Sequence, residues 1–189
     1  VTGTMSNKTF WKNKKVLITG NTGFKGSWLT ILLLEKKAKI IGISKKERKG
    51  LFLFNFLKLK NKISQYNLDI KNSKKIEKVI VKEKPDIIFH MAAQPIVRES
   101  YINPINTLET NVLGTINILN SLQKLKNRTA FINITTDKVY KQNKKNNFSE
   151  KDPLGGNDIY SSSKACSDII THSFYKSFFE KKNIGIATA

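Results

Sequence analysis

The sequence contains very little cysteine and no long apolar run. Cys166 is the only cysteine, so an intrachain disulfide and a cysteine-built metal site are both excluded. Its place in an apparent helix predicts a small buried side chain. No apolar run reaches the roughly 18 residues that suggest a membrane span, and no apolar segment follows the N-terminal charges as it would in a signal peptide. We therefore expect a cytoplasmic protein that makes no membrane contact and holds no metal.

Arginine and acidic residues are also scarce. The chain has 14 acidic residues against 34 lysines and arginines, and its net charge of +20 at first suggests a nucleic-acid partner. Only Arg48, Arg98 and Arg128 are arginines, however, and the lysines are scattered over polar helix faces and loops without interleaved aromatic residues to stack on bases. We expect no specific nucleic-acid partner, although the charge should attract anionic ligands such as diphosphates.

The length of the chain is enough for one hydrophobic core. The 189 residues are too few for two ordinary domains, so we expect one domain over 1–189, with residues 1–12 as a flexible N-terminal extension. Short apolar runs alternate with amphipathic stretches, which predicts a parallel sheet covered on both faces, a doubly wound Rossmann-type α/β fold. The expected strands lie near residues 15–19, 39–43, 64–68, 86–90, 130–135 and 184–188. The expected helices lie near residues 24–36, 73–83, 105–125 and 160–180, with a possible short helix within 50–63.

Glycines recur after the first expected strand, in the stretch GNTGFKG. Gly20, Gly23 and Gly26 follow a strand and open a helix, which is the context that a dinucleotide-binding turn requires. Glycine permits a tight turn and a close backbone approach, and the helix N-terminus offers unpaired N–H groups to a pyrophosphate. The spacing therefore indicates a dinucleotide cofactor. The alternative is a purely structural turn between strand and helix.

The residues after the second and third strands bear on which dinucleotide is bound. An acid usually stands at the end of the second strand to hold the ribose hydroxyls, but here Ser44 occupies that place. Lys45, Lys46 and Arg48 follow and are able to attract a 2′-phosphate, so these residues leave both NAD and NADP open. Asp69, after the third strand, is placed to bond an adenine amine or, alternatively, to cap the helix that follows.

Two further motifs carry polar chemistry. In YSSSK, Tyr160 and Lys164 share one helix face, and a nearby cation should lower the pKa of Tyr160 towards the range of a general base. In NITTDKVY, Thr136, Asp137 and Lys138 follow the fifth strand, where the substrate of an open α/β sheet sits. An aspartate turn capped by threonine is the structural alternative for this second motif.

In this order and on these elements, the three motifs resemble the extended short-chain dehydrogenase/reductase superfamily over essentially the whole chain. The stretches AAQPIVRESY and PLGGNDIYSSSK more narrowly resemble the CDP-glucose 4,6-dehydratase family, because the related dTDP-glucose dehydratases and UDP-hexose epimerases carry other residues around the same core. Family members continue beyond the position of Ala189 into a smaller domain that holds the nucleoside diphosphate. The resemblance thus implies that a C-terminal substrate lobe is missing and that activity is impaired.

The activity that this resemblance implies is the conversion of CDP-glucose to CDP-4-keto-6-deoxyglucose by an intramolecular redox dehydration. The residue matching Tyr160 takes the proton from the sugar O4, and the residue matching Thr136 helps to hold that oxygen. Asp137 matches the acid that protonates the C6 hydroxyl. Lys138 stands where the dTDP enzymes carry a glutamate base, and a lysine can serve as the C5 base only if its pKa falls well below about 10.4.

The resemblance also implies a tightly bound NAD. The matching cofactor positions are Gly20, Gly23, Phe24 and Gly26 at the pyrophosphate, Asp69 and Ile70 at the adenine, Ala92 and Ala93 along the fourth strand, and Tyr160 and Lys164 at the nicotinamide ribose. His90 matches a family histidine, which we interpret as a hydrogen-bonded structural residue. Family members pair through helices that match 105–125 and 160–180, so we expect a homo-oligomer.

Three other interpretations remain. The first is another NAD-dependent nucleotide-sugar dehydratase or a 4-epimerase, which the reaction product would distinguish. The second is a non-catalytic NAD-binding module. The third is a basic nucleic-acid binder, which salt-dependent binding to arbitrary DNA would reveal.

Overall fold

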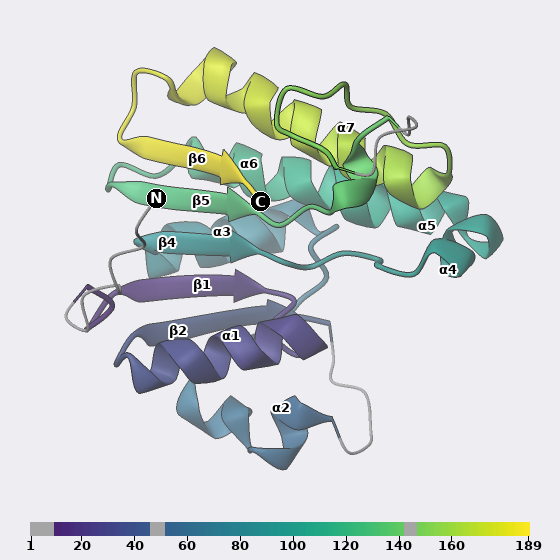
Figure 1. The fold of residues 1–189 in the computed structure, drawn as a ribbon. Helices are drawn as coiled ribbons and strands as arrows, with labels where there is room; N and C mark the ends of the chain where they lie inside the picture. Colours follow the sequence, from purple (N-terminus) through teal and green to yellow (C-terminus); the bar gives the residue numbers. More distant parts are fainter. Residues whose placement is uncertain (1–9, 46–51, 142–146) are drawn as a thin grey trace.

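The sheet at the centre of the molecule has six strands, all parallel (Figure 1). The computed structural model describes residues 10–45, 52–141 and 147–189. The strand order is β3-β2-β1-β4-β5-β6. From β1 the chain adds β2 and β3 on one side of the sheet, and it then crosses over to add β4, β5 and β6 on the other side. This order confirms the doubly wound Rossmann-type fold. The strands are β1 (Lys15–Thr19), β2 (Lys39–Ser44), β3 (Ser64–Asn67), β4 (Ile87–His90), β5 (Thr129–Asn133) and β6 (Ile184–Thr188).

The strands consist of short apolar runs because their side chains alternate between two covered faces. Leu17 and Ile88 point into a core cluster shared with α3 (Ser73–Glu83) and α6 (Gly114–Leu122). Val16 and Ile87, their neighbours, point into a second cluster shared with α1 (Phe24–Glu35). The register pairs Leu17 with Ile88 and Val16 with Ile87, so each apolar row continues from strand to strand.

Helices lie on both faces of this sheet. Figure 1 shows α1 in front of the sheet and α3 and α6 behind it. The α3 helix begins after Asn72, whose side chain accepts a hydrogen bond from the Lys75 N–H, and it buries Ile76, Val79 and Ile80 at helical spacing. The expected insertion between β2 and β3 forms α2 (Leu53–Phe56) and the short 3₁₀ helix η1 (Leu59–Lys62).

The helical region expected at 105–125 is divided. It consists of α5 (Pro104–Leu108), a π-helical turn η2 (Glu109–Leu113) and α6, and a separate helix α4 (Val97–Ile102) precedes it. Pro104 occupies the first turn of α5, where its missing N–H is no loss. The helix expected at 160–180 is α7 (Ile159–Phe174), followed by a second π-helical turn η4 (Tyr175–Phe179).

The prediction for Cys166 is wrong, because its side chain is exposed. Helix α7 directs Ser163, Ser167 and Thr171 into the core, and the position of Cys166 in the helical repeat lies away from that face. Of the expected N-terminal extension, residues 1–9 lie outside the described residues. Trp11 packs on Phe89, with ring centroids 6.4 Å apart.

Candidate active site

The glycine turn lies at the carboxyl end of β1, next to the point where the strand order reverses. Gly20 has φ +73°, and a Cβ there would lie 2.9 Å from the Ala92 backbone, so the turn and the segment after β4 are in close contact. A Cβ on Gly26 would lie 2.3 Å from the Gly20 carbonyl oxygen. Open α/β sheets bind ligands in the crevice at this point, and α1 begins here with backbone N–H groups that no side chain caps. The turn therefore fits a dinucleotide diphosphate.

The other residues predicted to line the diphosphate differ in exposure. Gly23 is exposed, and Phe24 is 77% exposed on the first turn of α1. Ala92 and Ala93 are half-buried in the segment that follows β4. Phe24 is thus open to solvent at the start of α1, and Ala92 belongs to the segment that approaches the glycine turn at Gly20.

A polar connection that the sequence did not reveal lies beneath the turn. Asn21 is fully buried, and its Nδ2 donates to Gln65 Oε1 at 2.7 Å. Gln65 Nε2 in turn donates to the Ser44 hydroxyl oxygen at 3.0 Å. A Cβ on Gly42 would lie 2.4 Å from Asn21 Nδ2, so the glycine in the middle of β2 makes room for this amide. The glycine turn is thus tied to Gln65 in β3 and, through it, to Ser44 at the end of β2.

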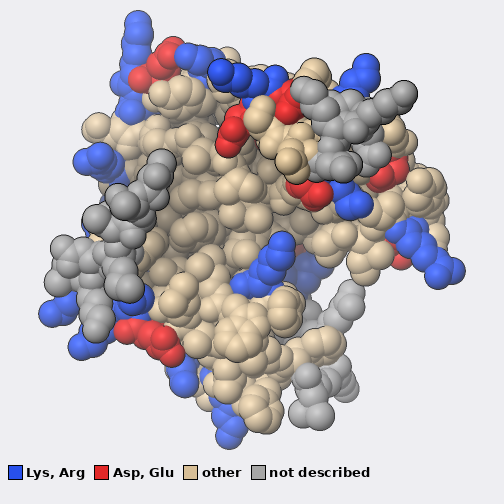
Figure 2. Space-filling model, viewed as in Figure 1, with Lys and Arg blue, Asp and Glu red and all other residues tan. Residues whose placement is uncertain are grey.

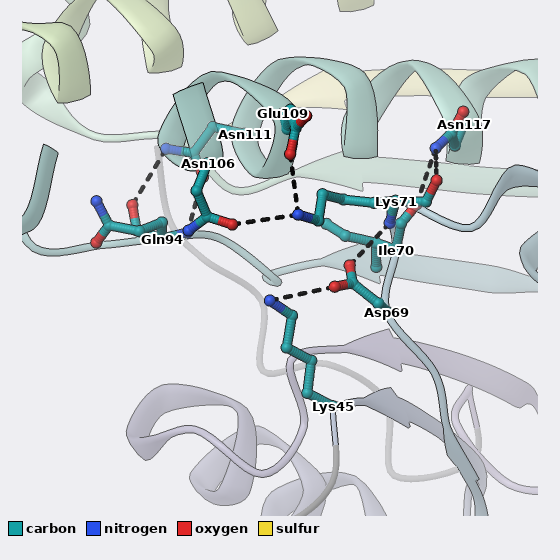
Figure 3. A network of polar contacts seen from close by, with 9 residues as sticks. All are labelled: Lys45, Asp69, Ile70, Lys71, Gln94, Asn106, Glu109, Asn111 and Asn117. Atoms are coloured by element: carbon teal, nitrogen blue, oxygen red, sulfur yellow. Dashed lines mark hydrogen bonds and ion pairs between the residues drawn. The ribbon is translucent and has the colours of Figure 1, made fainter. Parts of the chain in front are cut away.

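Asp69, Ile70 and Lys71 follow the end of β3 and belong to a network of polar contacts (Figure 3). Asp69 Oδ1 accepts a hydrogen bond from the Lys71 N–H at 2.9 Å, and Asp69 Oδ2 lies 3.2 Å from Lys45 Nζ. The alternative prediction that Asp69 caps the next helix is wrong, because Asn72 is the cap. Ile70 packs its side chain into the core against Gly114. Lys46 and Arg48 lie outside the described residues.

Helix α6 and the turn before it fix this segment in place. Asn117 Nδ2 donates to the carbonyls of Ile70 and Lys71 at 2.9 and 3.1 Å. Lys71 Nζ lies 3.0 Å from Glu109 Oε2 and donates to Asn106 Oδ1 at 3.2 Å. Figure 3 shows these contacts joining the loop after β3 to α5, η2 and α6.

The first turns of α7 carry Tyr160 and Lys164. Asp158 caps the helix, since its carboxylate accepts from the Ser161 N–H at 2.9 Å and from the Ser161 hydroxyl at 2.7 Å. Tyr160 is 9% exposed and Lys164 is 5% exposed. Lys164 Nζ donates to the Ile134 carbonyl at 2.8 Å, just beyond the end of β5. The cap and this bond hold both side chains at the carboxyl edge of the sheet.

The motif of Thr136, Asp137 and Lys138 meets Tyr160 at the carboxyl edge of the sheet. The Thr136 hydroxyl donates to Asp137 Oδ1 at 2.9 Å and lies in hydrogen-bond contact with the Tyr160 phenol. Thr136 also accepts from the Lys138 N–H at 3.4 Å and so caps the short 3₁₀ turn η3 (Asp137–Val139). The capped turn and the polar cluster therefore coexist. Lys138 is exposed, and its charge acts on Asp158.

Burial dominates the proton equilibria of the two residues on α7. It raises the pKa of Tyr160, with a smaller lowering by Thr136 and further increases from the charges of Asp137 and Asp158. It lowers the pKa of Lys164 to about 8, against the charge of Asp168. The expectation that Lys164 lowers the pKa of Tyr160 is therefore not met in this structure, because burial outweighs other effects and the ammonium bonds the Ile134 carbonyl.

Asn111 is a residue of this site that the sequence did not reveal. It is 1% exposed in the π-helical turn, where its Oδ1 accepts from the Gln94 N–H at 2.8 Å and its Nδ2 donates to the Ser163 hydroxyl at 2.9 Å. Ser163 donates to the Tyr160 carbonyl at 2.6 Å. An asparagine inside an expected helix, directly before Val112 and Leu113, was the available signal. Asn111 thus connects the segment after β4 to the helix that carries Tyr160.

His90 is a hydrogen-bonded structural residue, as predicted. Its Nδ1 lies 2.8 Å from the Thr19 hydroxyl, which already accepts from the Met91 and Ala92 N–H groups. The Thr19 proton must therefore go to Nδ1, and Nε2–H donates to the Thr115 hydroxyl at 3.0 Å. Burial and, to a lesser extent, the charge of Lys164 lower the pKa of His90 to about 3. The ring is neutral, in one tautomer.

Two kinds of feature are absent from the part of the chain that the structure describes. No helix in residues 10–45, 52–141 and 147–189 is both long and apolar enough to cross a membrane. The same ranges contain no group of three His, Cys, Asp or Glu side chains that could hold a metal ion.

Comparison with known proteins gives consistent matches. The family model described as GDP-mannose 4,6 dehydratase matches residues 17–188. The CDP-glucose 4,6-dehydratase of Salmonella typhimurium is 40% identical over 97% of this chain and 53% of its own length. The dTDP-D-glucose 4,6-dehydratase of Dictyostelium discoideum is 35% identical over 92% of this chain and 43% of its own length. The chain thus spans about half the length of these relatives.

The fold also matches solved structures. The UDP-glucose 4-epimerase from Brucella ovis, in complex with NAD, superposes with a TM-score of 0.79 at 17% identity, covering 93% of this chain and 50% of that one. At this identity the match shows the shared fold.

Proposed function

We propose, because the chain belongs to the GDP-mannose 4,6-dehydratase family, that it carries the cofactor-binding and catalytic residues of a nucleotide-sugar dehydratase that acts on CDP-glucose. The observation that carries this proposal is the meeting of Thr136 and Asp137 with Tyr160 at the carboxyl edge of the sheet. Identity to the CDP-glucose relative is 40%, against 35% to the dTDP-glucose relative, and Lys138 follows Asp137 where a glutamate is expected in the dTDP enzymes.

The cofactor we propose is NAD, with its diphosphate over Gly20, Gly23 and Gly26. The close approach of Gly20 to Ala92 and the N-terminus of α1 support this placement. Asp69 would hold the adenine amine, while Tyr160 and Lys164 would contact the nicotinamide ribose. NAD, when bound, supplies a hydride acceptor that is regenerated within one turnover, so that the net reaction is loss of water.

Each polar side chain at the edge of the sheet has a proposed task. Tyr160 accepts the proton of the sugar O4, and the Thr136 hydroxyl, already in contact with the phenol, orients that oxygen. Asp137 donates a proton to the departing C6 hydroxyl, and Lys138 is the candidate base at C5. Lys164, held by the Ile134 carbonyl, would position the nicotinamide ribose next to Tyr160. The buried, hydrogen-bonded setting of Tyr160 and Lys164 fixes their positions before substrate binds.

A 4-epimerase is the second candidate, because solved structures of epimerases share this fold. An epimerase would invert C4 without losing water. The acid Asp137 beside Tyr160 favours dehydration, since only dehydration has a leaving hydroxyl to protonate. A chain that binds NAD but performs neither reaction would be the non-catalytic alternative.

The reaction tests the proposal directly. In a protein extended to the length of the relatives, we expect CDP-glucose to give a 4-keto-6-deoxy product. Tyr160→Phe should lower the rate by at least about 10²-fold with NADH binding retained, because the base is lost while the turn is intact. Formation of a C4 epimer instead, or an unchanged rate for Tyr160→Phe, would contradict the proposal.

NADH titration tests the cofactor. A Cβ on Gly23 would lie 3.3 Å from the Gly20 carbonyl oxygen, so the fold can accept a side chain there with a small adjustment. We expect Gly23→Val to abolish NADH binding while the melting temperature changes little, since the branched side chain would occupy the place of the diphosphate. Unchanged affinity in this variant would contradict the placement.

We also propose a homo-oligomer that works in the cytoplasm. Ile105 on α5, Leu113 in η2 and Ile169 on α7 are 67%, 52% and 50% exposed, and they lie on the helices through which family members pair. A second copy of this surface would cover them. Leu113→Lys should dissociate the oligomer in size-exclusion chromatography, whereas Phe56→Lys, 70% exposed on α2, should not. The single, exposed Cys166 suits a reducing compartment.

A further inference from the structure

Two lysines in the polar network around Asp69 are each paired with an acid (Figure 3). Lys45 Nζ lies 3.2 Å from Asp69 Oδ2, and Lys71 Nζ lies 3.0 Å from Glu109 Oε2. The chain has 34 basic and only 14 acidic residues, so its carboxylates can pair only a minority of its cations. Where the structure describes this region, Lys45 and Lys71 are nevertheless each paired with a carboxylate.

Ser44, at the end of β2, does not by itself distinguish NAD from NADP. Its oxygen accepts from Gln65 Nε2 at 3.0 Å, which leaves the hydroxyl proton to be donated. A hydroxyl donor suits a ribose hydroxyl and a 2′-phosphate oxygen equally well. The discrimination must therefore come from the charges that surround it.

A 2′-phosphate carries up to two negative charges and requires a cation within hydrogen-bond distance. Lys45 directly follows Ser44, and its side chain is 58% exposed, so it can reach such a phosphate only by leaving Asp69. The Asp69 carboxylate would then remain close to the phosphate without its partner and would repel it. NAD has no phosphate at this position and leaves the ion pair intact.

We infer that Asp69 makes the site prefer NAD to NADP by holding Lys45, an inference that rests on the proposed function. Asp69 is then a specificity-determining residue in addition to its proposed contact with adenine. Because NADH and NADPH carry the same adenine, the ratio of their dissociation constants cancels that contact. The ratio reports only what happens at the 2′ position.

The experiment is a fluorescence titration of the 189-residue chain with NADH and with NADPH. We expect the wild type to prefer NADH, and Asp69→Asn to shift the ratio towards NADPH by about fivefold, the size of one exposed ion pair. Lys45→Gln in the Asp69→Asn background should remove the shift, and high salt should reduce it. Glu109→Gln is the matched control, since it releases Lys71 in the same way and should leave the ratio unchanged.

Several results of these NADH and NADPH titrations would contradict the inference. A ratio for Asp69→Asn within about 1.4-fold of the wild type, below the range of an exposed pair, or a shift that persists without Lys45, would overturn it. So would a wild type that binds NADPH more tightly than NADH, although dinucleotide binding itself would then stand. A wild type that binds neither cofactor would remove the proposed function together with the inference.

Discussion

His90 illustrates how completely a single buried residue is determined by its neighbours. Thr19 and Thr115 occupy both ring nitrogens, and the side chain is 2% exposed. A charged ring would need to donate from both nitrogens, but the Thr19 oxygen already accepts two backbone N–H groups. Desolvation therefore lowers the pKa of His90 to about 3. The folded protein keeps this histidine neutral well below the pH at which an unfolded chain protonates it.

We predict that this histidine makes the protein less stable in acid. Its pKa is lower in the folded than in the unfolded state, so its stabilisation is complete above pH 6.5 and is lost as the pH falls towards 3. The free energy of unfolding should fall by up to about 1.4 kcal/mol per pH unit below 6.5. Urea unfolding at pH 7.5 and 5 checks this, and His90→Asn should weaken the dependence. The control is His172→Asn, which replaces the other histidine of the chain at an exposed position. If the His90 variant and the wild type showed the same pH dependence, His90 would not be the source of the loss of stability in acid.

At the scale of elements, the sequence predicts the strands well because each is a short apolar run between polar residues. Lys15–Thr19 and Ile184–Thr188 agree with the expected ranges of 15–19 and 184–188. The long helix expected at 105–125 contains a π-helical turn at Glu109–Leu113 that the apolar period does not reveal. That turn depends on tertiary contacts, since it brings the Asn111 side chain to Gln94 and Ser163. Such contacts join residues far apart in the chain and are not encoded in a local pattern.

The candidate site shows the same division between local and tertiary information. The glycine turn and the spacing of Tyr160 and Lys164 are local features, and the structure places them at one edge of the sheet as expected. The pKa of Tyr160 depends on how deeply the phenol is buried, which the spacing to Lys164 does not predict. The role of Asn72 as the cap of α3, in place of Asp69, was equally hidden, because both residues suit a cap.

The π-helical turn supports the next prediction. Asn111→Leu would leave the Gln94 N–H, the Gln94 carbonyl and the Ser163 hydroxyl without the partners that Asn111 provides. We expect a loss of about 2–4 kcal/mol in the free energy of unfolding, since each buried polar group left unpaired costs about 1–3 kcal/mol and partial relaxation recovers some of it. Urea unfolding measures the loss. Asn120→Leu, at an exposed position on α6, should cost much less, and equal losses for the two variants would contradict the argument.

The whole molecule presents different surfaces to solvent. Figure 2 shows lysines and arginines mostly towards the rim of one face, with acids interspersed among them, and a broad uncharged area. On α1, Phe24, Trp28 and Leu32 are 77%, 54% and 50% exposed at a four-residue spacing, which forms one apolar stripe. A stripe of this kind is typical of a surface that another part of a protein covers.

The last prediction concerns the 189-residue chain on its own. We expect it to bind NADH, because the glycine turn, Asp69 and the first turns of α7 are all held by contacts within the described residues. We expect it to convert CDP-glucose far more slowly than a protein of the relatives' full length, since it spans only 53% of the CDP-glucose relative and has correspondingly fewer groups to orient the sugar nucleotide. Orientation of reacting groups can contribute about 7 to 11 kcal/mol to a reaction barrier, so its loss alone would suppress turnover. The measurements are NADH fluorescence titration and release of the 4-keto-6-deoxy product, with the full-length Salmonella enzyme as the reference. Comparable turnover by the two proteins would show that the described residues suffice for both binding and orientation of the sugar nucleotide.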